Sequence, residues 1–349
     1  LDSSSIASAV KHLNNSDVKL FSAIDDNPEY DESPFIDIMA NYLKADVQKL
    51  NLSLDKENIF KTLEELIWIN DQPVSSLSNL SHYLLVKMAR DSGIKVLMTG
   101  QGADELLCGY RKYLAFYVQY LIRNGKLSKA YRIIAEFYKN NSIINQFNFS
   151  EAKRYLKFFS QTGIKSFRGD ALKDIIPLNI GLKKGHDILS RQLMDFQYFS
   201  LPQLLHTEDR MSMAASTEMR VPFLDYELVE TVLPLCASNK LKNGWTKYIF
   251  GKSMEDFLPS AITWRKDKQN FGNAQGELLK GPLSKHIISN YFSSDSLIFK
   301  NKIMKQSGLI KTFKKYVNQK GNKGAVAYKE IFAPISLEIW LRKFENYIN

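Results

Sequence analysis

One stretch, residues 97–110 (LMTGQGADELLCGY), constrains the fold of this chain more than any other. Residues 94–98 form an apolar run, which predicts a buried strand. Two glycines follow, and they allow the backbone to turn sharply and to approach a ligand closely. Asp104 and Glu105 stand where a helix is expected to begin, a position at which the helix dipole favours carboxylates. A strand, a glycine turn and a helix start together predict a site for phosphate and a divalent cation.

The two common nucleotide-binding motifs are absent from the sequence. A dinucleotide fingerprint needs a third glycine where Glu105 stands, and a carboxylate there would repel a pyrophosphate. A Walker loop ending in Gly251-Lys252-Ser253 would need glycine at the position of Thr246. The simpler alternative for the stretch is an ordinary strand-to-helix turn with acidic capping.

The composition is that of a soluble globular protein with a substantial core. Of the 349 residues, 44% are hydrophobic and 24% are charged, so disorder is not expected. Cys108 and Cys236 are the two cysteines, which argues against a disulfide scaffold or a cysteine-rich zinc site and fits a cytoplasmic location. No apolar run is long enough to span a bilayer and no signal peptide is visible, so we expect no membrane partner.

The net charge of +10 raises the question of a nucleic acid partner. Part of this charge lies in the lysine-rich residues 300–323, where interleaved arginine and aromatic residues are sparse. We therefore interpret this stretch as a solvated helical face and expect no nucleic acid partner.

Helices and strands alternate through the first part of the chain. The expected strands are residues 18–24, 50–54 and 94–98, and the expected helices are residues 6–13, 35–43, 59–67 and 76–91. This alternation predicts an α/β fold with a doubly wound parallel sheet, in which ligands bind at the carboxyl ends of the strands. From residue 113 onward, aromatic residues at helical spacing predict packed helices. We therefore divide the chain into an α/β nucleotide-binding core, residues 1–112, and a mainly helical part, residues 113–349.

Two later clusters carry charged residues. In residues 201–225, two arginines alternate with carboxylates among apolar neighbours: Asp209, Arg210, Glu218, Arg220 and Asp225. Because charges in such company need partners, this cluster is either a structural ion-pair network or a substrate site, and the sequence leaves both open. In residues 264–272, Lys268 stands near an aromatic anchor, Phe271, and could reach a phosphate, although a lone lysine there would normally lie on the surface.

These clusters, in this order, resemble the synthetase domain of glutamine-dependent asparagine synthetases, which belongs to the PP-loop ATP pyrophosphatases. Residues 1–4 (LDSS) are similar to the second half of the phosphate loop S-G-G-L-D-S-S, and residues 99–105 (TGQGADE) to the element S-G-x-G-x-D-E. Residues 209–214 (DRMSMA) and 218–225 (EMRVPFLD) are similar to D-R-x-S-M and E-x-R-x-P-F-L-D. Lys268 falls where the family places a catalytic lysine. The similarity covers nearly the whole chain.

The resemblance implies a PP-loop fold followed by a mainly helical part, with ATP and Mg²⁺ as cofactors. Asp2 and Asp104 would hold Mg²⁺. Lys268 and Gln101 would be catalytic. The nucleotide and its pyrophosphate would be bound by Asp2, Ser3, Ser4, Ala23, Thr99 and Gly100. The remaining charged residues would bind substrate or form the structural network: Glu105, Asp209, Arg210, Glu218 and Arg220.

The implied reaction is ATP-dependent amide synthesis by a C–N ligase. A carboxylate, with aspartate as the first candidate, would be adenylated with release of pyrophosphate, because oxide is a poor leaving group and AMP is a good one. Metal, backbone N–H groups and lysine would offset the charge of the pyrophosphate. Ammonia, supplied from glutamine by a glutaminase domain or subunit, would then give the amide. The acceptor is thus a small-molecule carboxylate, and a homodimer remains an option.

The sequence departs from the family at the position of Gln101, which is a glutamate in well-known asparagine synthetases. Glutamine can form hydrogen bonds but cannot take a proton, which puts aspartate in doubt as the acceptor. An amidotransferase acting on a sugar acid or a peptide is the first alternative. A PP-loop enzyme acting on tRNA and a non-catalytic interaction module are two further alternatives.

The second departure is at the start of the chain. The serine and two glycines that open the phosphate loop are absent, as are the strand expected before them and a glutaminase domain with its N-terminal cysteine. Such a strand would be central to a doubly wound sheet. We therefore expect residues 1–349 on their own to fold poorly and to bind ATP weakly.

Overall fold

The structure is a computed structural model that describes residues 1–14, 17–26, 28, 31–51, 58–140, 167–175, 181–266, 278–281, 283–319 and 326–348. Lys268 lies outside the described residues, as does the end of the strand expected at residues 50–54. The described part is mostly helical, with four short strands.

The four strands form two parallel pairs. β1 (Lys19–Ile24) pairs with β2 (Asp46–Asn51), and β3 (Val96–Met98) pairs with β4 (Glu218–Arg220). The α/β class is therefore confirmed. The described residues form two separate two-stranded sheets, however, and do not show the single doubly wound sheet that the sequence predicts.

β3 is more exposed than its apolar sequence predicts. The side chains of Val96 and Met98 are 38% and 47% exposed. Within the described part of the chain β3 has one strand neighbour, β4, and these two alternate side chains are only partly covered. The prediction of a buried strand at this position is wrong.

The helices of the first part follow the expected periodicity. They are α1 (Asp2–Asn14), α2 (Ser33–Leu43), α3 (Ile59–Asn70) and α4 (Ser78–Asp91). α2 has a proline in its first turn, where no intrahelical N–H is required, and it ends at Lys44, which has a left-handed backbone.

The helix expected at Asp104 is only one turn long. α5 (Ala103–Leu106) is followed by Cys108, whose φ of 57° is left-handed, and the N–H of Gly109 donates to the carbonyl of Asp104. Gly102 has a φ of +88°, and a Cβ there would overlap the side chain of Leu224. Glycine therefore meets a conformational and a steric requirement at the start of α5.

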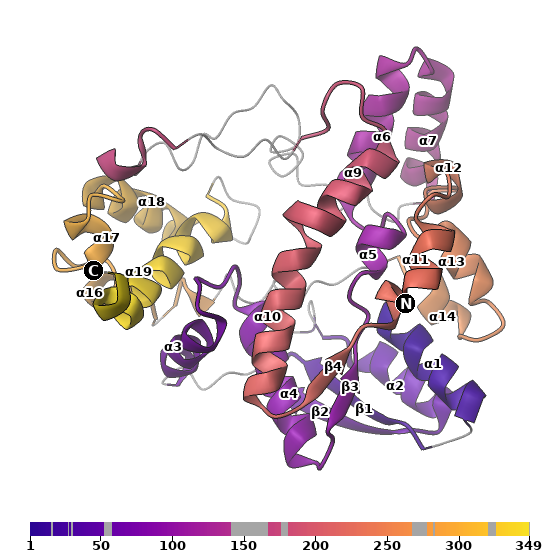
Figure 1. Cartoon of the computed structure of the whole chain (residues 1–349), viewed down its shortest axis with the longest axis horizontal. Helices are drawn as coiled ribbons and strands as arrows, with labels where there is room; N and C mark the ends of the chain where they lie inside the picture. Colours follow the sequence, from indigo (N-terminus) through magenta and orange to yellow (C-terminus); the bar gives the residue numbers. More distant parts are fainter. Residues whose placement is uncertain are drawn as a thin grey trace.

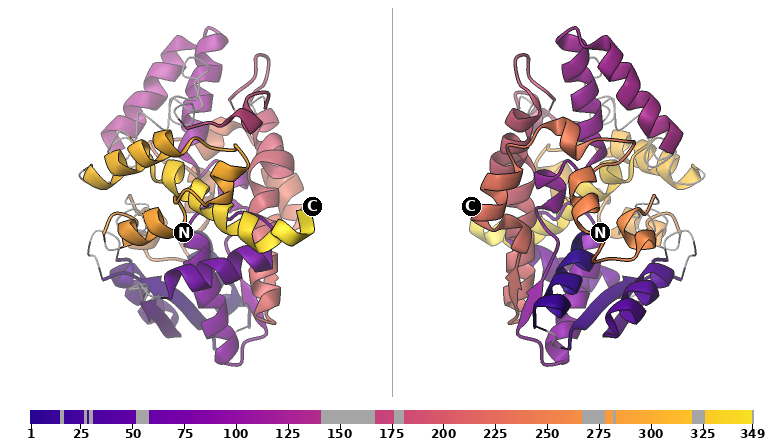
Figure 2. Two further views of the ribbon diagram at one scale, coloured as in Figure 1. Left: turned by 90° about the vertical axis from the view of Figure 1, so that its left-hand side faces the viewer. Right: turned by 90° about the vertical axis from the view of Figure 1, so that its right-hand side faces the viewer.

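The rest of the described chain is mainly helical. Its elements are α6 (Arg111–Arg123), α7 (Leu127–Asn140), η3 (Asp170–Leu172), α9 (Ile188–Met194), η4 (Asp195–Phe199), α10 (Leu201–Ala214), η5 (Pro222–Leu224), α11 (Tyr226–Val232), α12 (Ala237–Lys240), α13 (Tyr248–Ser253), α14 (Ser260–Thr263), α16 (Leu283–Asn290), α17 (Leu297–Lys300), α18 (Gln306–Asn318) and α19 (Tyr328–Ile348). α10 runs through the middle of the molecule and reaches β3 and β4 (Figure 1). The α6–α7 hairpin lies at the end of the molecule opposite the strands (Figures 1 and 2).

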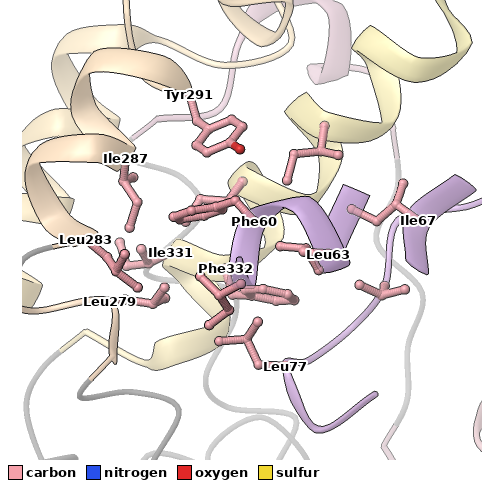
Figure 3. Packing of buried hydrophobic residues seen from close by; sticks show 14 of the residues in the cluster. Phe60, Leu63, Ile67, Leu77, Leu279, Leu283, Ile287, Tyr291, Ile331 and Phe332 are labelled. Carbon is pink, nitrogen blue, oxygen red and sulfur yellow. The ribbon is translucent and has the colours of Figure 1, made fainter. Parts of the chain in front are cut away.

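The largest core joins α3 and α4 to the C-terminal helices. Leu63, Leu66 and Ile67 of α3 are almost fully buried and belong to one cluster with Ile331 and Phe332 of α19 (Figure 3). Smaller clusters join α2 to α14 and α5 to η5. The helices after residue 113 are thus packed onto the elements that carry the glycine turn.

Both cysteines are free thiols, and burial raises the pKa of Cys108 to about 12. None of the described helices is long and apolar enough to cross a membrane.

We predict that Leu66→Ala lowers the free energy of unfolding by about 2–5 kcal/mol, because it leaves a cavity in the largest core. Leu66 is 0% exposed, whereas Leu13 at the end of α1 is 82% exposed. Leu13→Ala should therefore leave the urea unfolding midpoint nearly unchanged. Similar midpoints for the two variants would contradict the packing of α3 against the C-terminal helices.

Candidate active site

The glycine turn after β3 packs directly on the first turn of α1. A Cβ placed on Gly100 would lie 2.8 Å from Cβ of Asp2 and 3.1 Å from the backbone nitrogen of Ser3. A side chain at position 100 would therefore push the two segments apart. The structure brings together the two stretches in which the sequence analysis expected the phosphate-binding residues.

Lys247 lies between the two carboxylates expected to hold metal. Its Nζ is 2.5 Å from Oδ2 of Asp2 and 2.6 Å from Oδ1 of Asp104. Burial alone would lower the pKa of Lys247, but the charges of Asp104 and Asp2 raise that pKa above its ordinary value. The ammonium group therefore stays charged. Sequence analysis missed this lysine, which belongs to none of the motifs.

Gly109, the third glycine of residues 97–110, leaves room for Lys247 to reach Asp104. A Cβ on Gly109 would overlap both Oδ1 of Asp104 and Cε of Lys247. Sequence analysis did not assign a role to Gly109. The sequence did contain an indication of this role, because a glycine shortly after residues 99–105 is typical of a position where neighbouring groups approach the backbone closely.

The carboxylates of Asp2 and Asp104 fit a cation that also contacts phosphate. Oδ1 of Asp2 is buried and has no hydrogen-bond partner among the described residues. The described part of the chain holds no group of three or more His, Cys, Asp or Glu side chains that could bind a metal on their own. Mg²⁺ commonly uses one or two carboxylates together with substrate phosphates, so the donor set fits that ion when phosphate completes it.

Glu105 connects the turn to other parts of the chain through hydrogen bonds. Its Oε1 accepts hydrogen bonds from the hydroxyls of Tyr110 (2.9 Å) and Ser200 (2.7 Å). Burial raises the pKa of Glu105. The side-chain amide of Gln192 donates to the carbonyl of Glu105 at 2.6 Å, and Lys240 donates to Oε1 of Gln192 at 3.1 Å. These hydrogen bonds of Glu105 connect α5 to Tyr110, Ser200 and Gln192.

The other expected nucleotide-binding residues lie around the turn. Ser3 is exposed and Ser4 is half-buried, both in the first turn of α1, while Ala23 is buried near the end of β1. The N–H of Thr99 donates to the carbonyl of Arg220 at 3.0 Å. Gln101 is half-buried in the turn itself.

The charged residues of the second cluster lie at the surface. Asp209, Arg210, Glu218 and Arg220 are all exposed. Arg210 pairs with Asp71 at 2.9 Å, and Arg220 pairs with Glu218 at 2.7 Å. Exposed pairs of this kind contribute little to stability. The described structure shows two separate surface pairs here, and it does not place these residues with Asp2 and Lys247.

A buried carboxylate in the same helix was not singled out from the sequence. Glu208 of α10 is 3% exposed, and burial raises its pKa to about 7, while the nearby hydroxyl of Thr99 acts in the opposite direction. Oε1 of Glu208 lies 3.7 Å from Nε2 of His82 in α4. Burial lowers the pKa of His82 to about 4, so the imidazole is neutral at pH 7.

The sequence model of the asparagine synthase family matches residues 1–342. The chain belongs to the asparagine synthase family. The match includes all four strands, the glycine turn and the exposed arginine motifs, and it confirms the resemblance recognised in the sequence.

Similar curated proteins come from bacteria and fungi. The chain is 26% identical over 290 residues to asparagine synthetase [glutamine-hydrolyzing] 1 of Bacillus subtilis, covering 76% of this chain and 44% of that protein. It is 27% identical over 229 residues to a putative asparagine synthetase of Mycobacterium tuberculosis, covering 58% and 33%. It is 23% identical over 344 residues to amidase chry2 of Gibberella zeae, covering 82% and 50%. The chain thus spans half or less of the length of these relatives.

We predict that Lys247→Ala lowers the free energy of unfolding by about 2–4 kcal/mol. Removing one partner of a fully buried ion pair costs ~3–5 kcal/mol, and the loss here is somewhat smaller because both carboxylates keep some contact with solvent. The matched control is Lys252→Ala, which breaks an exposed pair with Glu255 at the same 2.6 Å. Urea unfolding should separate the two variants, and equal midpoints would contradict the role given to Lys247.

Proposed function

We propose that the chain is the synthetase domain of an ATP-dependent amide-forming ligase. In this proposal it adenylates a small-molecule carboxylate, with aspartate as the first candidate, and passes the acyl group to ammonia. The observation that carries the proposal is the convergence of Asp2, Asp104 and Lys247 under the turn at Gly100. Residues 1–112 would form most of the nucleotide site, and residues 113–349 would complete it.

The anionic phosphates of ATP would bind at the first turn of α1. The backbone N–H groups of that turn and the hydroxyls of Ser3 and Ser4 support this role, because helix N-termini bind anions. Gly100, the backbone of Thr99 and the backbone near Ala23 would contact the nucleotide. Mg²⁺ bound by Asp2 and Asp104 would offset charge on the pyrophosphate. Lys247 would keep the two carboxylates together and face the same phosphates.

The chemical steps follow from these positions. A carboxylate oxygen of the acceptor attacks the α-phosphorus, and the bond to the β-phosphate breaks with its electron pair leaving on pyrophosphate. Ammonia then attacks the acyl carbon, AMP leaves with the electrons of the C–O bond, and the nitrogen loses one proton to solvent. Lys268, by the family resemblance, would stabilise negative charge that develops in both steps.

The acceptor would lie near Gln101, which has no proton-accepting group of its own. Because the family commonly has glutamate here, we keep a second candidate function: amidation of a sugar acid or a peptide. The similarity over 344 residues to amidase chry2, whose name is not that of an asparagine synthetase, supports keeping a second candidate. Ammonia would come from a glutaminase domain or subunit, since the relatives named above as synthetases hydrolyse glutamine according to their names. A cytoplasmic location and homodimer formation remain predictions.

We predict that the full-length protein forms AMP and pyrophosphate in equal amounts from ATP. Asp104→Asn should lower acid-dependent ATP–pyrophosphate exchange by about tenfold or more, because one metal-binding charge is lost. Isotope exchange and product analysis by chromatography measure both effects. ADP and inorganic phosphate as the products would rule out this function.

We predict that Gln101→Glu changes acceptor use and leaves ATP affinity within about twofold, because position 101 lies in the turn and forms no part of the Asp2–Lys247–Asp104 group. The measurement is kcat/KM for a panel of acids, with the KM for ATP as the internal control. Identical acid profiles for the two forms would show that this position does not contact the acceptor.

A further inference from the structure

Four buried polar atoms beside the glycine turn have no hydrogen bond of good geometry among the described residues, although the hydroxyl of Thr99 lies near enough to the carboxylate of Glu208 to lower its pKa. They are both carboxylate oxygens of Glu208, the hydroxyl of Thr99 and Nε2 of His82. The 3.7 Å between Oε1 of Glu208 and Nε2 of His82 is longer than a hydrogen bond. Buried polar groups are almost always satisfied in folded proteins, so this group calls for a ligand.

The three residues come from three elements that pack together. His82 belongs to α4, Thr99 follows β3, and Glu208 belongs to α10, which contacts α4 and β4. Figure 1 shows the C-terminal end of α10 beside the β3–β4 pair. Adjacent residues of the turn thus face two different groups: Gly100 faces Asp2, and Thr99 faces Glu208.

The four atoms select a chemical class of ligand. Each of them can accept a hydrogen bond, with Nε2 of His82 accepting when the ring proton is on Nδ1. Among the described residues, no lysine or arginine forms an ion pair with Glu208. Burial raises the pKa of Glu208 to about 7, and a positively charged ligand would favour its ionised form. A small group with several N–H donors and a positive charge matches both properties.

We propose that Glu208, Thr99 and His82 form a binding site for a small cationic nitrogen group of a substrate. This inference rests on the proposed amide synthesis, which consumes ammonia and takes an acceptor that can carry an amino group. The occupant is then either an ammonium ion or the amino group of the acceptor, and both present the same donors and charge. The site lies next to the turn that contains Gln101. Glu208 would supply there the carboxylate that the amide side chain of Gln101 does not provide.

The test is Glu208→Gln in the full-length protein, because glutamine keeps the size of the side chain and removes its charge. Amide synthesis gives the KM for ammonium chloride, with potassium chloride holding the ionic strength constant. ATP–pyrophosphate exchange needs no ammonia, and it gives kcat/KM for an acid with and without its amino group, such as L-aspartate and succinate. We expect the variant to raise the KM for ammonium tenfold or more, or to reduce the preference for the amino acid tenfold or more. The first result assigns ammonium to the site, and the second assigns the acceptor.

Two controls make the result decisive. Glu230→Gln changes an exposed carboxylate in α11 and should leave both quantities unchanged. His82→Leu removes one acceptor atom and keeps Glu208. It should change the KM for ammonium or the amino-acid preference, whichever Glu208→Gln changes, in the same direction by a smaller factor. This second variant keeps the proposal testable if Glu208→Gln folds poorly. Normal exchange with unchanged KM values and preference in both variants would mean that the group holds a structural water, and would overturn the proposal. Failure of exchange with every acid in the unmutated protein would instead contradict the proposed function.

Discussion

The ion pairs of Lys247 with Asp2 and Asp104 hold the candidate site together. The two carboxylates belong to α1 and α5, and both lie within 2.6 Å of Nζ of Lys247. Without that cation between them, the two negative charges would repel one another. Lys247 adopts a left-handed backbone, with a φ of 52°, to place its ammonium there. That conformation costs about 1–2 kcal/mol for a residue with a side chain, and the two ion pairs offset this cost.

The packing around this interaction fixes two of its three partners, Lys247 and Asp104. α13, which begins after Lys247, contributes Ile249 and Phe250 to the cluster that also contains Leu106 of α5. The side-chain amide of Gln192 donates hydrogen bonds to the backbone carbonyls of Glu105 and Leu106 in α5. Buried Lys240 in turn donates to Oε1 of Gln192. The turn is therefore fixed from both sides, which limits the reorganisation that phosphate binding would require.

The sequence predicted the local features of this fold well and its long-range features poorly. Helical periodicity located α3 and α4 because their apolar faces repeat within each helix. The exposure of Met98 could not be predicted, because it depends on which strands and helices lie beside β3. Lys247 was missed for a similar reason: it meets Asp2 across 245 positions of sequence, and no local pattern reports such a contact. Acidic residues at a helix start indicated that a cation was needed but not which residue would supply it.

The proposed reaction needs two different environments beside this turn, one for phosphate and one for a cationic nitrogen group. Phosphate binding requires positive charge and N–H groups, which in the proposed function Lys247 and the start of α1 would supply beneath Gly100. A cationic nitrogen requires acceptors and negative charge, and those would compete with phosphate for the same cations if they lay in the same place. Because Thr99 and Gly100 face different groups, one short turn separates the two requirements. In the proposed reaction this separation would keep the nitrogen close to the acyl carbon and its carboxylate away from the departing pyrophosphate.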